Sequence, residues 1–119
     1  MHYTPYFISV PSQAPSGFTV TASTSTSITA SWQLPPKYAR HGTITGFKLF
    51  YTKKASQGPP NVLTNNVTSL SKVVSGLDKY TEYEFQVLAF TSKGDGPKSS
   101  VVVERTKEDG KNSPTDVLI

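Results

Sequence analysis

The chain has 119 residues, which is enough for one domain of ordinary size and too few for two domains with proper cores. Hydrophobic residues make up 35% and charged residues 17%, a balance that suits a globular domain and argues against disorder along the whole length; the net charge of +4 is mild. The absence of cysteine excludes disulfides, thiolate metal sites and a thiol nucleophile. No apolar run approaches the roughly 20 residues that a membrane span needs.

The patterned part of the chain predicts β-strands and no helix. Residues 1–13 and 108–119 have no clear period and are interpreted as tails or linkers. Between them, apolar and polar residues alternate with a period of two, which places each apolar set on one face of a strand. Short strands separated by turn residues are typical of a β-sandwich. In chain order, we expect strands at residues 18–22, 27–32, 46–53, 61–64, 72–75, 81–90 and 99–105.

Several motifs in a fixed order carry a family resemblance. "TSITASW" places Trp32 in the second expected strand, and Pro35-Pro36 follows it. "GTITGFKLFY" forms the third strand, "SGLDKYTEYEFQVLAF" the turn and sixth strand, and "SKGDGPKSS" with Thr106 the last hairpin. From about residue 11 to 107 the chain resembles the fibronectin type III family. The resemblance implies a seven-stranded, antiparallel, immunoglobulin-like sandwich, with domain bounds at residues 14–107.

The alternating apolar residues predict the core. Two sheets stack about 10 Å apart, so each inner face must supply bulky side chains. Burial of one such aromatic residue stabilises the fold by roughly 2–3 kcal/mol. Tyr83, at the entry to the sixth strand, resembles a tyrosine corner, in which the hydroxyl bonds to backbone a few residues upstream. The predicted core comprises Trp32, Phe47, Leu49, Tyr51, Leu77, Tyr83, Phe85 and Val87.

No motif indicates catalytic chemistry. The two histidines, His2 and His41, have no neighbouring carboxylate or serine at a telling spacing. Glu82 and Glu84 share the outer face of one strand and are interpreted as solvated acids, because no cleft is expected there. Glycine-rich phosphate loops and metal-ligand clusters are absent from the sequence. We therefore expect a protein that is not an enzyme and that uses no cofactor or metal.

Lys93-Gly94-Asp95 is one conservative step from Arg-Gly-Asp, the tripeptide that integrins bind. The resemblance places it in the loop between the sixth and seventh strands, which is also the position of the integrin-binding tripeptide in fibronectin. The same residues form a Gly-x-Gly turn, in which Gly94 and Gly96 would supply positive φ angles. We interpret the segment as a structural turn and keep integrin binding as the alternative.

Two further motifs suggest ligands or modification. Lys53-Lys54 is a weak candidate for a polyanion such as a heparin-like glycosaminoglycan, because clustered lysines attract sulfate. The other basic residues are scattered and no RNA-binding aromatic motif is present, so no nucleic acid partner is expected. Asn66-Val67-Thr68 is an N-glycosylation sequon in a predicted loop.

The third and sixth expected strands carry apolar residues on both faces. A contiguous exposed apolar patch more often marks an interaction surface than an isolated residue does. We therefore predict a partner surface on the outer face; cover by the chain's own loops or tails is the alternative. In the following valine run we expect Val102 to point inward. The predicted partner surface comprises Phe50, Leu88 and Phe90, flanked by Lys48 and Gln86.

The family resemblance implies a module of a larger multidomain cell-surface receptor, similar to those of immunoglobulin-superfamily adhesion and guidance receptors. It implies a spacer and protein-binding domain, monomeric in isolation, whose partner is a receptor, a ligand or a neighbouring module. The expected location is the extracellular part of a single-pass membrane protein, with no direct membrane contact by this domain. The alternatives are a secreted matrix protein, an intracellular sarcomere-type module, and a binding appendage of a receptor phosphatase or another enzyme.

Overall fold

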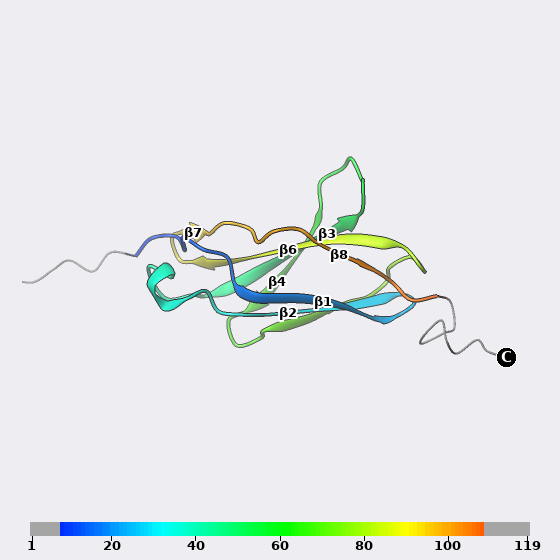
Figure 1. The fold of residues 1–119 in the computed structure, drawn as a ribbon. Helices are drawn as coiled ribbons and strands as arrows, with labels where there is room; N and C mark the ends of the chain where they lie inside the picture. The colour runs from blue at the N-terminus through cyan, green and yellow to red at the C-terminus, as the bar shows by residue number, and fades with distance from the viewer. Residues whose placement is uncertain (1–7, 109–119) are drawn as a thin grey trace, which may run out of the picture.

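The computed structural model describes residues 8–108 and shows two antiparallel β-sheets packed face to face (Figure 1). The smaller sheet has the order β1 (Ser16–Thr24), β2 (Ser27–Gln33), β5 (Ser71–Val74). The larger sheet has the order β4 (Asn61–Asn66), β3 (Gly46–Lys53), β6 (Glu82–Thr91), β7 (Gly94–Asp95), and β8 (Val102–Arg105) also pairs with β6. The predicted all-β sandwich is confirmed. In this described part of the chain, no helix is long and apolar enough to cross a membrane.

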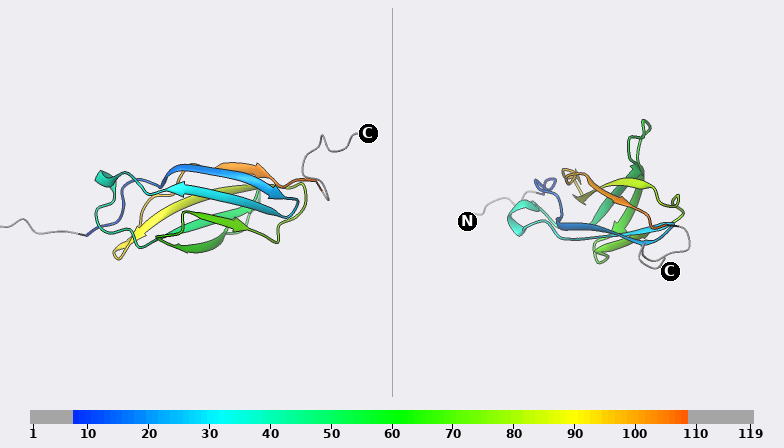
Figure 2. Two further views of the ribbon diagram at one scale, coloured as in Figure 1. Left: turned by 90° about the horizontal axis from the view of Figure 1, so that it is seen from below. Right: turned by 45° about the vertical axis from the view of Figure 1, so that its right-hand side comes forward.

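Burial follows the alternation in the sequence. On β2, Ile28, Ala30 and Trp32 are buried, whereas the residues between them are half-buried on the other face. The inner face of β6 is buried in the same way. The two faces differ because an antiparallel sheet that packs on a core with one side leaves its other side to water. Figure 2 shows the two layers from two further directions.

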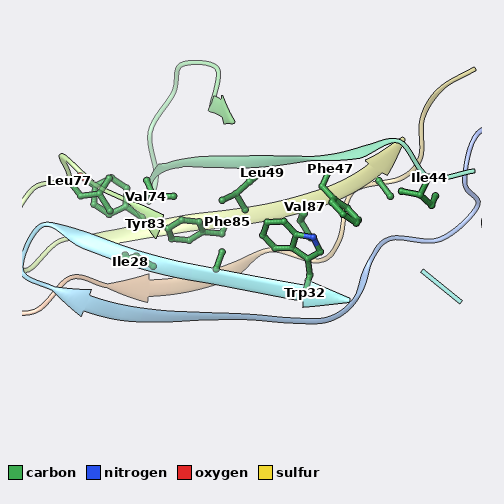
Figure 3. Close-up of a cluster of buried hydrophobic side chains, with 12 residues drawn as sticks. Ile28, Trp32, Ile44, Phe47, Leu49, Val74, Leu77, Tyr83, Phe85 and Val87 are labelled. Atoms are coloured by element: carbon green, nitrogen blue, oxygen red, sulfur yellow. The ribbon is translucent and has the colours of Figure 1, made fainter. Parts of the chain in front are cut away.

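Trp32 lies at the centre of the core that the two sheets enclose (Figure 3). Its ring lies 5.5 Å from that of Phe47 in an edge-to-face arrangement, and Phe18 flanks it at 6.5 Å. Such aromatic pairs add about 0.5–1.5 kcal/mol beyond area burial. Tyr51 is the one predicted core residue that stays half-buried, and its ring stacks on Phe85 at 6.2 Å. The other predicted core residues are buried: Trp32, Phe47, Leu49, Leu77, Tyr83, Phe85 and Val87.

The turn before β6 contains the tyrosine corner that the sequence predicts. The Asp78 N–H donates a hydrogen bond of 2.8 Å to the Tyr83 hydroxyl. The turn begins at Gly76, whose φ of 74° is one that L side chains rarely adopt. Thr106, directly after β8, links that segment to the corner. Its Oγ1 accepts a hydrogen bond from the Thr81 N–H at 2.8 Å and donates one to the Asp78 carbonyl at 2.7 Å.

Tyr83→Phe is expected to lower the free energy of unfolding by about 1–3 kcal/mol, because the Asp78 N–H then lacks its partner. Urea denaturation would measure the change. Tyr51→Phe is the matched control: its hydroxyl has no hydrogen-bond partner among the described residues, so we expect a change within about 0.5 kcal/mol. Equal losses in the two variants would show that the corner bond does not stabilise the fold.

The N-terminal segment that we predicted to be a tail lies partly against the domain. Pro11 is buried, and the Ser9 and Ser12 N–H groups donate to the carbonyls of His41 and Ala39. The Thr91 hydroxyl donates to the Ser9 carbonyl at 2.6 Å. Sequence reasoning missed this because the segment has no period; its order comes from backbone hydrogen bonds. Residues 1–7, including His2, and 109–119 lie outside the described residues.

Candidate protein-binding face

The outer face of the larger sheet presents a shallow groove around Phe50. In the sheet register, Phe50 on β3 lies between Val62 on β4 and Gln86 on β6. The loop from β3 to β4 stands out from the sandwich beside this face (Figure 1). We name the depression the Phe50 groove, lined by Phe50, Tyr51, Thr52, Pro60, Glu84, Gln86, Lys98 and Val101.

Exposed valines lie in the Phe50 groove and on the strands beside it. Val62, Val101 and Val103 are 48%, 51% and 40% exposed, so apolar surface continues across β4 and β8. The ammonium of Lys98 lies 4.1 Å from the centroid of the Phe50 ring, within the range of a cation–π contact. Gln86 donates to the Ser99 carbonyl at 2.9 Å, which holds the segment before β8 against β6. The result is an apolar centre with a polar and basic rim.

Leu88 corrects the predicted partner surface. We expected it to be exposed, but it is only 3% exposed. Lys48 lies opposite Leu88 in the register, and its ammonium reaches the Asp95 carboxylate on β7 at 3.0 Å. Because β6 lies between β3 and β7, the aliphatic part of Lys48 crosses β6 beside Leu88. The expected exposure is therefore wrong for Leu88.

The other predicted members separate into two groups. Phe50 and Gln86 lie together in the Phe50 groove, and both are half-buried and not fully exposed. Half-buried Phe90 lies instead beside Lys48, whose ammonium is 5.6 Å from its ring centroid. Sequence reasoning missed Val62 and Lys98, because the register of β4 on β3 and the path of the segment before β8 bring them to Phe50. Val102 is half-buried between its exposed valine neighbours, as the inward orientation requires.

Lys93-Gly94-Asp95 belongs to a tight hairpin, in which Lys93 lies in the turn and Gly94 and Asp95 form β7. Thr91 pairs with Gly94, and Phe90 pairs with Asp95, so the segment belongs to the β6–β7 ladder. The Lys93 N–H donates to the Thr91 hydroxyl at 3.2 Å. The carboxylate of Asp95 forms the ion pair with Lys48, and an integrin would have to break this pair to bind it. The geometry favours the turn interpretation.

Only the first of the two turn glycines has the backbone that we expected. Gly94 has a φ of 141°, whereas Gly96 has no positive φ, so our expectation for Gly96 is wrong. Glycine is favoured at position 96 for a steric reason instead, because its surroundings leave no room for a side chain. A Cβ at this position would lie 2.8 Å from the Pro11 Cβ and 3.2 Å from the Ala89 carbonyl oxygen.

Gly96→Val is expected to lower the free energy of unfolding by about 1–3 kcal/mol, because the side chain would displace Pro11 and the end of β6. Gly58→Val is the control, since no atom lies within 4 Å of a Cβ there and its φ is not positive. We expect that variant to stay within about 0.5 kcal/mol of the parent in a urea denaturation. Equal stability of both variants would contradict the packing at Gly96.

The lysines proposed for polyanion binding are both in ion pairs. Lys53 pairs with Asp78, and Lys54 pairs with Glu82 at 3.5 Å. Arg105 also contacts Glu82, at 3.6 Å, so this carboxylate lies between two cations. The hydrogen bond and the negative charge of Asp78 raise the pKa of the Lys53 ammonium above its ordinary value. Polyanion binding at Lys53 and Lys54 stays a prediction, and it would compete with these carboxylates.

Asp78→Asn is expected to lower the pKa of Lys53 toward its ordinary value of about 10.4. A raised pKa in the folded state means that the pair contributes its stability below the unfolded pKa and loses it as pH rises through the folded pKa. The stability difference between parent and variant should therefore be constant from neutral pH to about pH 10 and shrink above that. NMR titration of the Lys53 ammonium tests the pKa; an unchanged value would show that the pair does not form in solution.

The geometry defines the chain as an immunoglobulin-like β-sandwich without disulfides, with one partly apolar outer face. The model of the family described as "Fibronectin type III domain" matches residues 13–105. The chain belongs to the fibronectin type III family.

The relatives are long proteins that contain segments similar to this chain. Protein sidekick-2 of Mus musculus is 39% identical over 112 residues, which cover 92% of this chain and 5% of the relative. Tyrosine-protein phosphatase Lar of Drosophila melanogaster and cell adhesion molecule DSCAM of Homo sapiens are each 38% identical over 109 residues. The match covers 91% of this chain and 5% of each relative. The chain spans about 5% of the length of the curated relatives it matches.

Solved structures support the same fold. The FN5 domain of Drosophila Lar is 32% identical, with a TM-score of 0.67 that covers 82% of this chain and 98% of that one. The fn3 domain of human contactin 1 has a TM-score of 0.76 over 94% of this chain and 92% of that one, at 21% identity. The relatives include a protein named as a cell adhesion molecule, which fits the class of receptor expected from the sequence.

Proposed function

We propose that this chain is a non-catalytic module of a larger cell-surface adhesion protein and that it binds a protein partner through the Phe50 groove. Its family and its similarity to segments of DSCAM and sidekick-2 support the adhesion role. Fold alone does not define a function, so the binding role is argued from the residues of the groove. The observation that carries it is the groove lined by Phe50 and Val101 on an outer sheet face, with exposed Val62 and Val103 on the flanking strands β4 and β8.

The groove has the composition of a protein-binding hot spot. Aromatic and aliphatic side chains form its centre, while Gln86, Lys98 and Glu84 supply hydrogen-bonding and charged groups at the rim. The ammonium of Lys98 lies over the Phe50 ring, so a partner that contacts this ring meets a positive charge beside it. This would favour a partner with an acidic group next to its apolar contact residue. The rest of the chain would act as a spacer that holds this face in position.

A parent protein with phosphatase activity is the second candidate. The similarity to Lar, which is named as a tyrosine-protein phosphatase, favours it. In that case the catalytic chemistry would belong to another part of the parent protein; the described residues contain no cluster of His, Cys, Asp or Glu that could hold a metal ion. The module would still act by binding.

The test uses cells that display the full-length protein from which this module comes. It measures how strongly these cells adhere to one another and to unmodified cells of the same tissue. Phe50→Ser is expected to weaken binding by about 2 kcal/mol, which is roughly 30-fold in affinity, since it removes the centre of the groove. Val73→Ser is the matched control, because Val73 is 56% exposed but lies on β5 in the other sheet. It should leave adhesion unchanged.

Both variants must match the unsubstituted protein in surface abundance and thermal stability, so that a difference in adhesion reports on binding alone. Equal adhesion by the parent and by Phe50→Ser would overturn the groove as the partner surface. Equal losses in Phe50→Ser and Val73→Ser would show that neither sheet face is specific.

A further inference from the structure

Two adjacent asparagines at the end of β4 have opposite environments. Asn65 is 7% exposed and points into the sandwich, where its side-chain amide donates to the Ser69 carbonyl, the Ser69 hydroxyl and the Ser71 carbonyl. Asn66 is exposed and lies on the outer face of the larger sheet. Its side-chain Nδ2 donates no hydrogen bond to any described residue. Asn65 therefore serves the fold, whereas the amide nitrogen of Asn66 is free to react.

The turn after β4 holds the Asn66 side chain by its oxygen. Thr68 donates to Asn66 Oδ1 through its backbone N–H at 2.9 Å and through its hydroxyl at 3.0 Å. This is the Asx-turn arrangement. Asn66, Val67 and Thr68 also form the only Asn-x-Ser/Thr triplet in the sequence. Because the turn engages Oδ1 and leaves Nδ2 unbonded, the fold can carry a substituent on that nitrogen without losing a hydrogen bond.

The same asparagine stands at the end of a free sheet edge. β4 is the outermost strand of the larger sheet, and within the described residues it pairs only with β3. The strand contains no charged residue, and its register with β3 has no bulge. Charges, bulges and coverings are the usual protection of an edge against pairing with another chain. Pro59 and Pro60 protect the beginning of this edge, and the sequon stands at its other end.

We propose that Asn66 carries an N-linked glycan and that this glycan covers the free edge of β4. The modification rests on the proposed function only for its cellular setting, since it requires passage through the secretory pathway. The donor would be a lipid diphosphate-linked oligosaccharide. Asn66 Nδ2 forms a bond to the anomeric carbon, the bond from that carbon to the diphosphate oxygen breaks, one amide proton is released, and the lipid diphosphate leaves with the electron pair.

The position of the glycan is compatible with the proposed partner surface. Asn66 and Val62 are four residues apart on β4, which corresponds to roughly 13 Å along a strand. The first sugar would therefore lie beside Gly46, which pairs with Asn66, and not at Phe50. A glycan there would restrict the approach of a partner to the side of the groove nearer Val101 and β8.

The first experiment is secretion of the full chain from mammalian cells behind an added signal peptide. The parent and Thr68→Ser should show an increase in mass that an N-glycan-cleaving amidase removes, whereas Thr68→Ala and Asn66→Gln should not. The amidase should also convert residue 66 to aspartate, which peptide mass spectrometry detects. Unmodified Asn66 in the folded, secreted parent would overturn the proposal, and the adhesion test of Phe50→Ser would remain unaffected by that result.

The second experiment tests the covering role by sedimentation of the secreted proteins over a range of concentrations. The glycosylated parent should remain monomeric, while Asn66→Gln should self-associate as its concentration rises. Adding Thr64→Lys to Asn66→Gln should restore the monomer, because Thr64 is an exposed residue of the same strand and a lysine protects an edge by charge. A monomeric Asn66→Gln protein at every concentration would overturn the covering role.

Discussion

Trp32→Ala is expected to unfold the domain or bring it close to unfolding, with a loss of about 3–5 kcal/mol in the free energy of unfolding. The residue is 1% exposed and has aromatic neighbours on both sides, Phe18 on β1 and Phe47 on the opposite sheet. Its removal would leave a cavity between two sheets whose backbones are each held by hydrogen-bonded ladders, so the walls cannot collapse to fill it. For a domain with a total stability of about 5–15 kcal/mol, such a loss is a large fraction.

Far-UV circular dichroism during urea denaturation is the suitable measurement, because Trp32 is the only tryptophan and its fluorescence disappears in the variant. Trp32→Phe is the control. The indole Nε1 is buried without a hydrogen-bond partner among the described residues, so phenylalanine removes an unsatisfied donor and keeps most of the packing. We expect a clearly smaller loss for Trp32→Phe than for Trp32→Ala. A free energy of unfolding for Trp32→Ala within about 1 kcal/mol of the parent value would show that Trp32 is not at the centre of the core.

The sequence predicted the inner faces of the sheets well. A strand that packs on a core with one face must place apolar residues at every second position, and Ile28, Trp32, Phe85 and Val87 follow this rule. The tyrosine corner was predicted from the family resemblance, because Tyr83 stands at the entry to the sixth strand, and the Asp78 N–H does donate to its hydroxyl. These features depend on local spacing, which the sequence contains directly.

The outer face was less predictable because it depends on neighbours that are distant in the sequence. Period alone places Phe50 and Leu88 on the same face, yet one lines a groove and the other is covered. The difference comes from Lys48, whose ammonium reaches Asp95 across β6, and from Lys98, which lies over Phe50. Both contacts require the hairpin and the register of three strands. No spacing within one strand contains this information.

Leu88→Ala is expected to lower the free energy of unfolding by about 2–5 kcal/mol, although Leu88 lies on the face that points away from the core. Leu88 is 3% exposed and lies opposite Lys48, whose side chain extends toward Asp95 on β7. The ion pair above it is exposed and contributes at most about 1 kcal/mol, so the apolar contact and not the charge dominates at this position. Lys48→Met should accordingly change stability far less than Leu88→Ala, because methionine keeps much of the aliphatic cover.

Val62→Ala provides the matched comparison on the same face, since Val62 is 48% exposed and lies beside Phe50. We expect it to cost less than about 1 kcal/mol, which is the range of strand propensity at a solvated position. Urea denaturation of the three variants distinguishes the two halves of the outer face: a covered half at Leu88, where we expect a large loss of stability, and an open half at Val62, where we expect a small one. A loss in Leu88→Ala no larger than that in Val62→Ala would mean that Leu88 is exposed in solution, and the partner surface would then extend from the Phe50 groove toward β7.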